Sequence, residues 1–160
     1  MKYSIKHLSL RLTYMDTVHD RVFPEIWFQP EEICRVVSEW TVEYRTSESV
    51  KQLIEKIKLL NEFPLPNKEA ITSNETHIYI RTRDEVTFDV EYVTELKPVT
   101  LPIHDVIYLF EQYYNWLFQY ENCQIPGLIP RNKLDSWLCV PREQVKPEYL
   151  AELDAKSKQT

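Results

Sequence analysis

Glycine is almost missing from this chain. Gly127 is the single glycine among 160 residues, whereas ordinary usage would place about 11 glycines in a chain of this length. A phosphate-binding P-loop, a dinucleotide-binding G-x-G-x-x-G turn and a G-x-S-x-G nucleophile elbow each require at least two glycines. The sequence therefore excludes the enzymes that depend on these three motifs.

Cysteines and long apolar runs are also scarce. Cys34, Cys123 and Cys139 are the only three cysteines, and an odd number without C-x-x-C spacing leaves at least one thiol free, which favours a reducing compartment. Cys123 and Cys139 lie among apolar residues, so we expect buried structural thiols rather than nucleophiles. The longest uninterrupted apolar run covers 106–110, far below the ~20 residues of a membrane span. We expect a cytoplasmic protein that does not associate with membranes.

What is present is the composition of a folded domain. The chain is 43% hydrophobic, 28% charged and 12% aromatic, and about 160 residues suffice to bury one sizeable core. No internal repeat or low-complexity tract occurs. We therefore expect residues 1–160 to form a single domain.

Apolar periodicity predicts strands in two regions. Alternation over 8–14 indicates an N-terminal strand, residues 15–30 are expected to be a loop, and 76–95 indicates a β-hairpin that turns at Asp84-Glu85. We expect the N-terminal strand and the hairpin to form one small antiparallel sheet. Pro126-Gly127 is typical of a type II turn in which the glycine has positive φ.

Helical spacing appears in four segments. Apolar residues recur from Pro30 to Tyr44, although β-branched residues leave a strand as the alternative there. Ser49 and Gln52 match a capping box, and Pro147 indicates a short final helix, with 156–160 frayed. The segment 102–121 is apolar nearly all round, which places it at the centre of the fold. The prediction is an α+β domain whose small sheet packs on the 102–121 helix, with two or three further helices.

Negative charge is unevenly distributed. The net charge is −6, yet the stretch from Asp84 to Pro130 holds eight acids and one base, Lys97, so it carries −7 and the rest carries +1. These acids are either ordinary solvated side chains or a surface for a basic partner. The residues predicted to bind a partner are Asp84, Glu85, Asp89, Glu91, Tyr92, Glu95, Glu111, Tyr114 and Glu121. The absence of Lys/Arg clusters argues against direct binding to nucleic acid.

No catalytic or metal-binding motif is recognisable. The four histidines lack metal-ligand spacing. Asp89 and Glu91 share a predicted strand face, where two carboxylates could bind a metal or divide acid and base roles. They are equally the expected polar face of a half-exposed strand. We therefore predict no catalytic residues, no metal and no cofactor.

In overall character the chain resembles bacterial immunity proteins that neutralise polymorphic or contact-dependent growth-inhibition toxins. The resemblance lies in small size, acidity, abundant aromatic residues and the tyrosine-bearing acidic span from Asp84 to Tyr120. It implies stoichiometric binding to a cationic, nuclease-type toxin, with carboxylates occupying the place of phosphates. Those proteins share no single fold, so the resemblance implies a role and not an architecture.

Three alternatives remain open at this stage. A phage-type inhibitor that mimics nucleic acid would favour a more extreme excess of acids than this chain has. An adaptor subunit of a larger assembly cannot be separated from the immunity interpretation by sequence. A small hydrolase would use Asp89, Glu91 and a histidine, and a divalent metal would then raise its melting temperature. The oligomeric state is not predicted.

Overall fold

The computed structural model describes residues 5–14, 21–64, 71–73, 76–131 and 139–158. The described elements, in chain order, are β1 (Lys6–Tyr14), β2 (Arg21–Gln29), α1 (Glu31–Glu43), α2 (Ser47–Glu62), β3 (Ile71–Ser73), β4 (Thr76–Tyr79), β5 (Glu85–Val90), β6 (Val99–Pro102), α3 (Ile103–Glu121), β7 (Val140–Pro141), the 3₁₀ helix η1 (Arg142–Gln144) and α4 (Pro147–Ser157). The predicted α+β class is confirmed.

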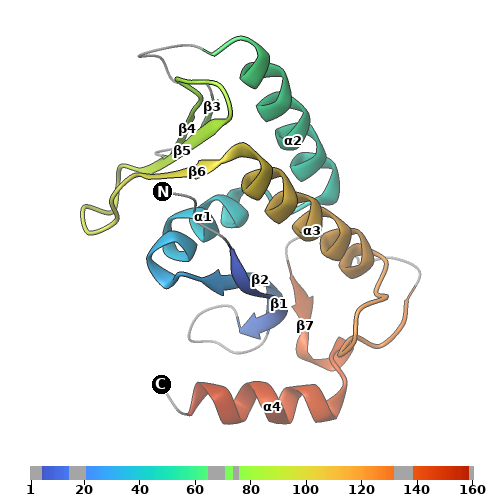
Figure 1. Cartoon of the computed structure of the whole chain (residues 1–160). Coiled ribbons are helices and arrows are strands. Elements are labelled where there is room, and N and C mark those ends of the chain that lie inside the picture. Colours follow the sequence, from blue (N-terminus) through green and yellow to red (C-terminus); the bar gives the residue numbers. More distant parts are fainter. Residues whose placement is uncertain (1–4, 15–20, 65–70, 74–75, 132–138, 159–160) are drawn as a thin grey trace.

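The described strands form two antiparallel sheets (Figure 1), with orders β1-β2-β7 and β3-β4-β5-β6. The N-terminal strand and the hairpin therefore belong to different sheets, which corrects the expected single sheet. Helix α1 packs against β2 and β5, and α3 packs against β2, β5, β6 and α2. Because both helices present apolar side chains to two sides, each needs a sheet on either side to bury them.

Strand β2 corrects the expectation of a loop over 15–30, of which 15–20 lie outside the described residues. Its even-numbered residues from Val22 to Phe28 are buried, as a strand with one face on the core requires. Pro24 obscures this pattern in the sequence because proline disfavours central strands. Among the described residues, β7 pairs with Arg21 and Val22 only, and Pro24 is paired with Leu12 of β1.

The helix predicted from Pro30 and the amphipathic helix after it are both present. Helix α2 begins one turn earlier than the sequence motif indicates. Thr46 is the N-cap, and its side chain accepts from the Ser49 backbone N–H at 3.1 Å, while Ser49 Oγ accepts from the Thr46 N–H at 3.3 Å. The capping box therefore joins Thr46 to Ser49, and Ser49 is its third helical residue rather than its cap.

Helix α3 ends at Glu121 as predicted but begins at Ile103, one residue later than the predicted 102–121 segment, with Pro102 as its N-cap, and no glycine caps its C-terminus. Cys123 follows the helix with a φ of 54°, the left-handed conformation that normally favours glycine. Its N–H donates to the Tyr120 carbonyl at 2.9 Å, and the Gln124 N–H donates to the Gln119 carbonyl at 2.8 Å. These two bonds form a Schellman motif. The Cys123 thiol is buried and accepts a hydrogen bond from Gln144, so Cys123 has a structural role.

The predicted β4–β5 hairpin is present but shorter than 76–95, because β5 ends at Val90 and turns follow. Asp84 adopts the left-handed conformation in the hairpin turn, with a φ of 69°. Aspartate tolerates this conformation better than most residues. In a chain with one glycine, aspartate thus supplies the turn.

The C-terminal segment packs on the first sheet. Helix α4 begins at Pro147 as predicted, and Gly127 has the expected positive φ of 98°. The helix extends through Ser157, and 159–160 lie outside the described residues, so the fraying expected for 156–160 stays a prediction. A second, smaller core forms beneath α4 around Leu12, Tyr120 and Leu153.

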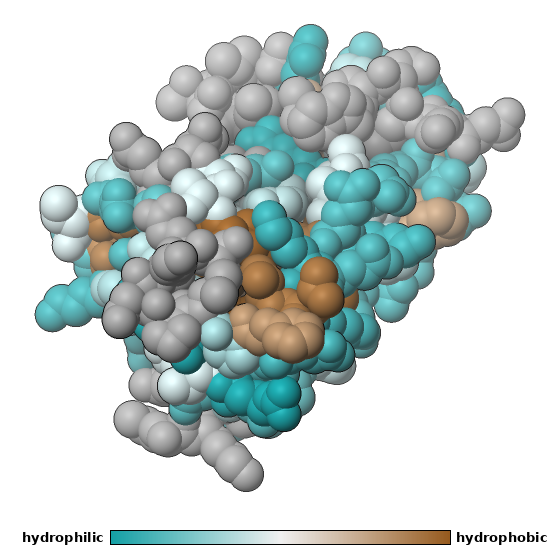
Figure 2. Space-filling view, turned by 90° about the horizontal axis from the view of Figure 1, so that it is seen from above, coloured by the Kyte–Doolittle hydropathy of each residue, from teal (hydrophilic) through white to brown (hydrophobic). Residues whose placement is uncertain are grey.

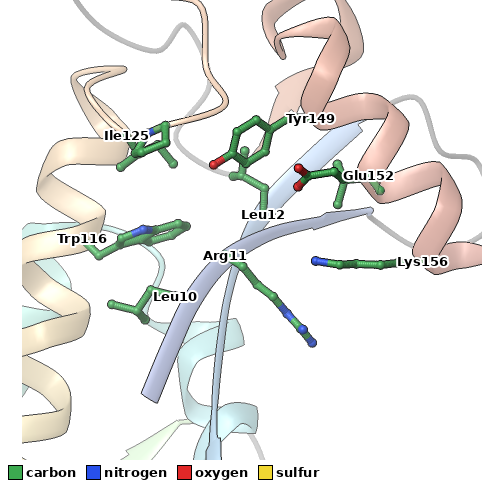
Figure 3. Close-up of a pocket in the computed structure, with 10 residues that line it drawn as sticks. Leu10, Arg11, Leu12, Trp116, Ile125, Tyr149, Glu152 and Lys156 are labelled. Carbon is green, nitrogen blue, oxygen red and sulfur yellow. The ribbon is translucent and has the colours of Figure 1, made fainter. Parts of the chain in front are cut away.

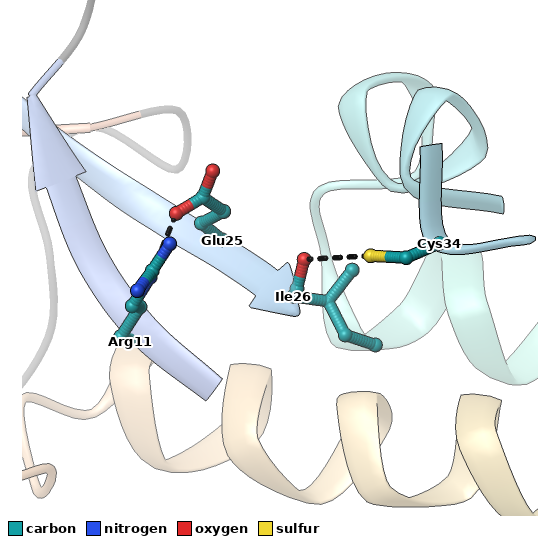
Figure 4. A network of polar contacts seen from close by, with 4 residues as sticks. All are labelled: Arg11, Glu25, Ile26 and Cys34. Carbon is teal, nitrogen blue, oxygen red and sulfur yellow. Dashed lines mark hydrogen bonds and ion pairs between the residues drawn. The ribbon is translucent and has the colours of Figure 1, made fainter. Parts of the chain in front are cut away.

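All three cysteines are buried, and none of them forms a disulfide. Cys34 lies on α1 with its sulfur 3.9 Å from the Ile26 carbonyl of β2 (Figure 4). Burial raises the pKa of the Cys34 thiol, so the thiol is held in its unreactive neutral form. The same view shows Arg11 of β1 paired with Glu25 of β2 at 2.9 Å, a cross-strand ion pair on the other face of the sheet.

Two buried tyrosines make stability sensitive to alkaline pH. Burial raises the pKa values of Tyr113 and Tyr120 above the ordinary value of 10.0. The unfolded chain ionises these phenols near pH 10 while the folded chain keeps them neutral. The free energy of unfolding therefore keeps the full contribution of these two phenols below about pH 10. Above about pH 10 it falls by about 1.4 kcal/mol per pH unit for each phenol.

We predict that Tyr120→Phe is close to neutral at pH 7, because the Tyr120 hydroxyl has no hydrogen-bond partner in the described structure. Above pH 10 the variant should lose about 1.4 kcal/mol less per pH unit than the parent protein. Urea titrations between pH 7 and 11.5 measure both effects. Tyr108→Phe is the control, since Tyr108 is 51% exposed, and an equal change in slope for both variants would contradict the prediction.

Candidate acidic interface

The nine residues predicted to bind a partner are divided among three places in the structure. Asp89, Glu91, Tyr92 and Glu95 lie where β5 ends and in the turns that follow, Asp84 and Glu85 lie at the β4–β5 turn, and Glu111, Tyr114 and Glu121 lie on α3. Five residue steps along β5 separate Asp84 from Asp89, which is about 17 Å. The acidic span therefore does not form one continuous patch.

The end of β5 gathers carboxylates around a buried histidine. His77 of β4 is the cross-strand partner of Asp89, and its Nε2 lies 3.2 Å from Glu91 Oε1. The His77 side chain is only 6% exposed, whereas that of Glu91 is 58% exposed. Glu91 thus reaches from the surface back to His77, which anchors the start of the turn after β5.

Helix α1 adds two carboxylates that sequence analysis did not select. The Tyr92 hydroxyl donates to the Glu39 carboxylate. The hydroxyl of Thr76, which pairs with Val90 at the end of the sheet, donates to the Ser73 carbonyl at 2.7 Å and lies 3.3 Å from both carboxylate oxygens of Glu43. Glu39 and Glu43 are one helical turn apart, so they share one side of α1. The sequence shows the four-residue spacing that puts Glu39 and Glu43 on one side of a helix. It does not show that this helix, α1, lies next to the end of β5.

We call this surface the acidic sheet end. Its members are Glu39, Glu43, Asp89, Glu91, Tyr92 and Glu95. Tyr92 is 50% exposed, and Glu95 is also exposed. A half-exposed aromatic ring among carboxylates is an arrangement suited to basic side chains, because Lys and Arg can pair with the acids while their stems pack on the ring.

The hairpin-turn acids are used by the fold. The Asp84 backbone N–H donates to Asn61 Oδ1 at 2.7 Å, and the Asn61 amide donates to Asp84 Oδ1 at 3.1 Å. These two bonds tie the last turn of α2 to the hairpin. Glu85 accepts from Thr82 Oγ1 at 2.8 Å within the same turn. Asp84 therefore has an assigned structural role.

The α3 residues also have partners within the chain. Both carboxylate oxygens of Glu121 are engaged at the start of α2, one accepting from the Ser47 N–H and the other from its hydroxyl, each at 2.6 Å. A carboxylate at a helix N-terminus compensates the unpaired N–H groups and the helix dipole. Glu111 lies 3.7 Å from Lys58 of α2, and Tyr114 packs against the main core and the Phe118 ring. These three residues join α3 to its neighbours.

Among the described residues, the face shown in Figure 2 has no large apolar patch that could serve as an alternative binding surface. That face is mostly hydrophilic, with a small group of hydrophobic side chains near its middle. The exposed large apolar residues of the described chain are Leu59, Phe63, Tyr92, Tyr108, Phe118 and Ile129. Binding at the acidic sheet end would therefore depend on charge more than on apolar area.

The acidic sheet end brings together the residues of the hydrolase alternative, namely Asp89, Glu91 and a histidine. A catalytic imidazole must be within reach of its substrate, and the His77 side chain is almost fully enclosed. Among the described residues, no group of three or more His, Cys, Asp or Glu side chains is placed to hold a metal ion. The geometry matches a structural histidine better than a catalytic one.

Comparisons with protein-family models, curated proteins and solved structures find no match to this chain. Within the described residues, no helix combines the length and apolarity needed to cross a membrane.

Proposed function

We propose that this protein binds and neutralises a basic protein partner, in the manner of a toxin-specific immunity protein, through the acidic sheet end. The observation that carries the proposal is that carboxylates from two elements lie at one end of the second sheet: Glu39 and Glu43 of α1 contact Tyr92 and Thr76, while Asp89 and Glu91 lie beside His77. Glu39 accepts a hydrogen bond from Tyr92, whose side chain is 50% exposed. A cationic surface would be attracted over a distance and then packed against Tyr92.

Preorganisation supports a binding role. Hydrogen bonds and contacts from Glu39, Thr76 and His77 hold the acidic sheet end in place before a partner arrives. A surface that is already ordered loses little conformational entropy on association. The three cysteines, none of them in a disulfide, favour a reducing compartment, so we place this activity in the cytoplasm, and we propose no direct contact with nucleic acid or membrane.

The charge requirement is testable with two exposed acids. We predict that Glu91→Lys combined with Glu95→Lys slows association with the partner about tenfold or more at low salt. The matched control is Glu55→Lys with Glu62→Lys, which makes the same change in net charge on the exposed side of α2. The control should bind within about twofold of the parent, because its sites lie outside the acidic sheet end.

The measurement begins with the immobilised protein and a host lysate at low salt. The retained protein is identified by mass spectrometry, purified, and its association rate is measured from low to high salt. A rate that falls with salt and with the sheet-end reversal supports the proposal. Equal rates for the reversal and the control, or retention of an acidic partner only, would overturn it.

A further inference from the structure

A small pocket lies between α4 and β1, away from the acidic sheet end (Figure 3). It lies between β1, α3, the turn containing Gly127 and α4, and its volume is about 140 Å³. Its apolar walls are formed by Leu10, Leu12, Trp116, Ile125, Pro126, Tyr149 and Leu153. A cavity of about 150 Å³ accommodates a benzene-sized molecule, so the pocket matches one apolar group of about six carbon atoms.

The walls are held in place by packing. The Trp116 ring stacks on Tyr120 with 5.6 Å between centroids and an interplanar angle of 9°. Tyr149 rests directly against Gly127, where an added Cβ would lie 2.7 Å from the ring. Leu12 and Leu153 are buried in the smaller core. The pocket is therefore a formed feature of the fold and not a gap between mobile side chains.

The rim of the pocket carries one acid and one base from the same helix. Glu152 and Lys156 both line it, and residues four apart on a helix place their Cβ atoms about 5–6 Å from each other. In Figure 3 both side chains extend from α4 toward β1. Arg11, the other charged lining residue, has its guanidinium committed to Glu25 and to the Trp27 ring. Glu152 and Lys156 are thus the charges available to a ligand.

We propose that this pocket binds a small apolar α-amino acid in its zwitterionic form. The aliphatic side chain would lie against Trp116 and the leucines, the ammonium group would face Glu152, and the carboxylate would face Lys156. An opposite-charge pair at the mouth complements a ligand that carries both charges next to an apolar body. This site lies apart from the acidic sheet end and does not depend on the function proposed for it.

Calorimetric titration with L-leucine and three analogues tests the assignment. The analogues are 4-methylpentanoate, which lacks the ammonium group, 3-methylbutylamine, which lacks the carboxylate, and N-acetyl-L-leucinamide, which has neither charge. We expect L-leucine to bind with the lowest Kd and each single-charge analogue to bind about tenfold more weakly, since one charge-assisted contact is lost. The uncharged analogue should bind weakest of all.

Two variants separate the charges. Glu152→Gln should weaken L-leucine about tenfold while leaving the Kd of 4-methylpentanoate unchanged, and Lys156→Gln should weaken L-leucine while leaving 3-methylbutylamine unchanged. Both residues are exposed, so the fold should tolerate the changes. The matched controls, Glu148→Gln on α4 and Lys158→Gln at its C-cap, alter exposed residues that do not line the pocket.

The proposal is supported if each rim variant affects only the ligands that carry the charge it recognises. No heat of binding for L-leucine at millimolar concentration would overturn it. Equal affinity for N-acetyl-L-leucinamide and L-leucine would also overturn it, because the rim charges would then have no part in recognition. So would an equal loss of affinity in the control variants.

Discussion

Trp40→Ala is expected to lower the free energy of unfolding by about 3–5 kcal/mol, the range for removing a fully buried aromatic side chain. Trp40 is entirely buried on α1. Its ring stacks on Tyr44 at 5.7 Å and meets the edge of Phe88 at 6.2 Å, and Phe88 in turn contacts Phe110 of α3. The substitution would therefore open a cavity where α1, β5 and α3 meet.

Trp40→Phe should cost much less than Trp40→Ala. The smaller ring retains most of the aromatic contacts, and it removes the indole N–H, which has no hydrogen-bond partner in the described structure. Trp27→Ala is the matched control, because Trp27 is half-buried on β2 and carries Arg11 over its ring. Urea unfolding followed by circular dichroism measures all three. A loss for Trp40→Ala no greater than that for Trp27→Ala would count against the packing account.

The second large effect is expected at the one glycine. Gly127→Ala should destabilise the fold by about 3 kcal/mol, from two causes. A residue with a side chain is strained at a φ of 98°, and the new Cβ would lie 2.7 Å from the Tyr149 ring, so α4 must shift. The Gly127 carbonyl also accepts from the Lys146 N–H at 2.7 Å, which couples the turn to the start of α4.

A double-mutant cycle separates the two causes. In the Tyr149→Ala background the ring is absent, so Gly127→Ala should retain only the backbone strain of about 1–2 kcal/mol. Thermal or urea unfolding of the four proteins gives the coupling energy. If Gly127→Ala costs the same in both backgrounds, the ring contact contributes nothing. A parent-like stability for Gly127→Ala alone would contradict the strain as well.

The sequence predicted those helices and turns that depend on interactions between residues close together in the chain. The stripe behind Ser49, the apolar density of 102–121 and the proline at 147 each specify a helix through periodicity or backbone geometry. The positive φ of Gly127 follows from Pro126-Gly127 alone. The start of α2 was misplaced by one turn because Thr46 and Ser49 together satisfy the cap, whereas the pattern seen in sequence begins at Ser49.

Strand partners and surface roles depended on contacts between distant segments. The sequence predicts a loop at β2 because proline disfavours central strands, whereas the folded chain pairs Pro24 with Leu12 of β1. The acidic span looked uniform in sequence, yet Glu121 closes the start of α2 while Glu91 reaches His77. Charge along a chain does not reveal which carboxylates already have partners within the fold, because those partners lie 74 and 14 residues away.

The sequence by itself therefore determined the α+β class, the helices and the scarcity of glycine, because these follow from composition and short-range periodicity. Only the tertiary structure decided that the strands form two sheets and that α1 lies between them. It alone brought Glu39 and Glu43 to the end of β5 and placed the Tyr149 ring on Gly127. Such placements arise from burying apolar faces on two sides of a helix, a requirement that involves the whole chain at once.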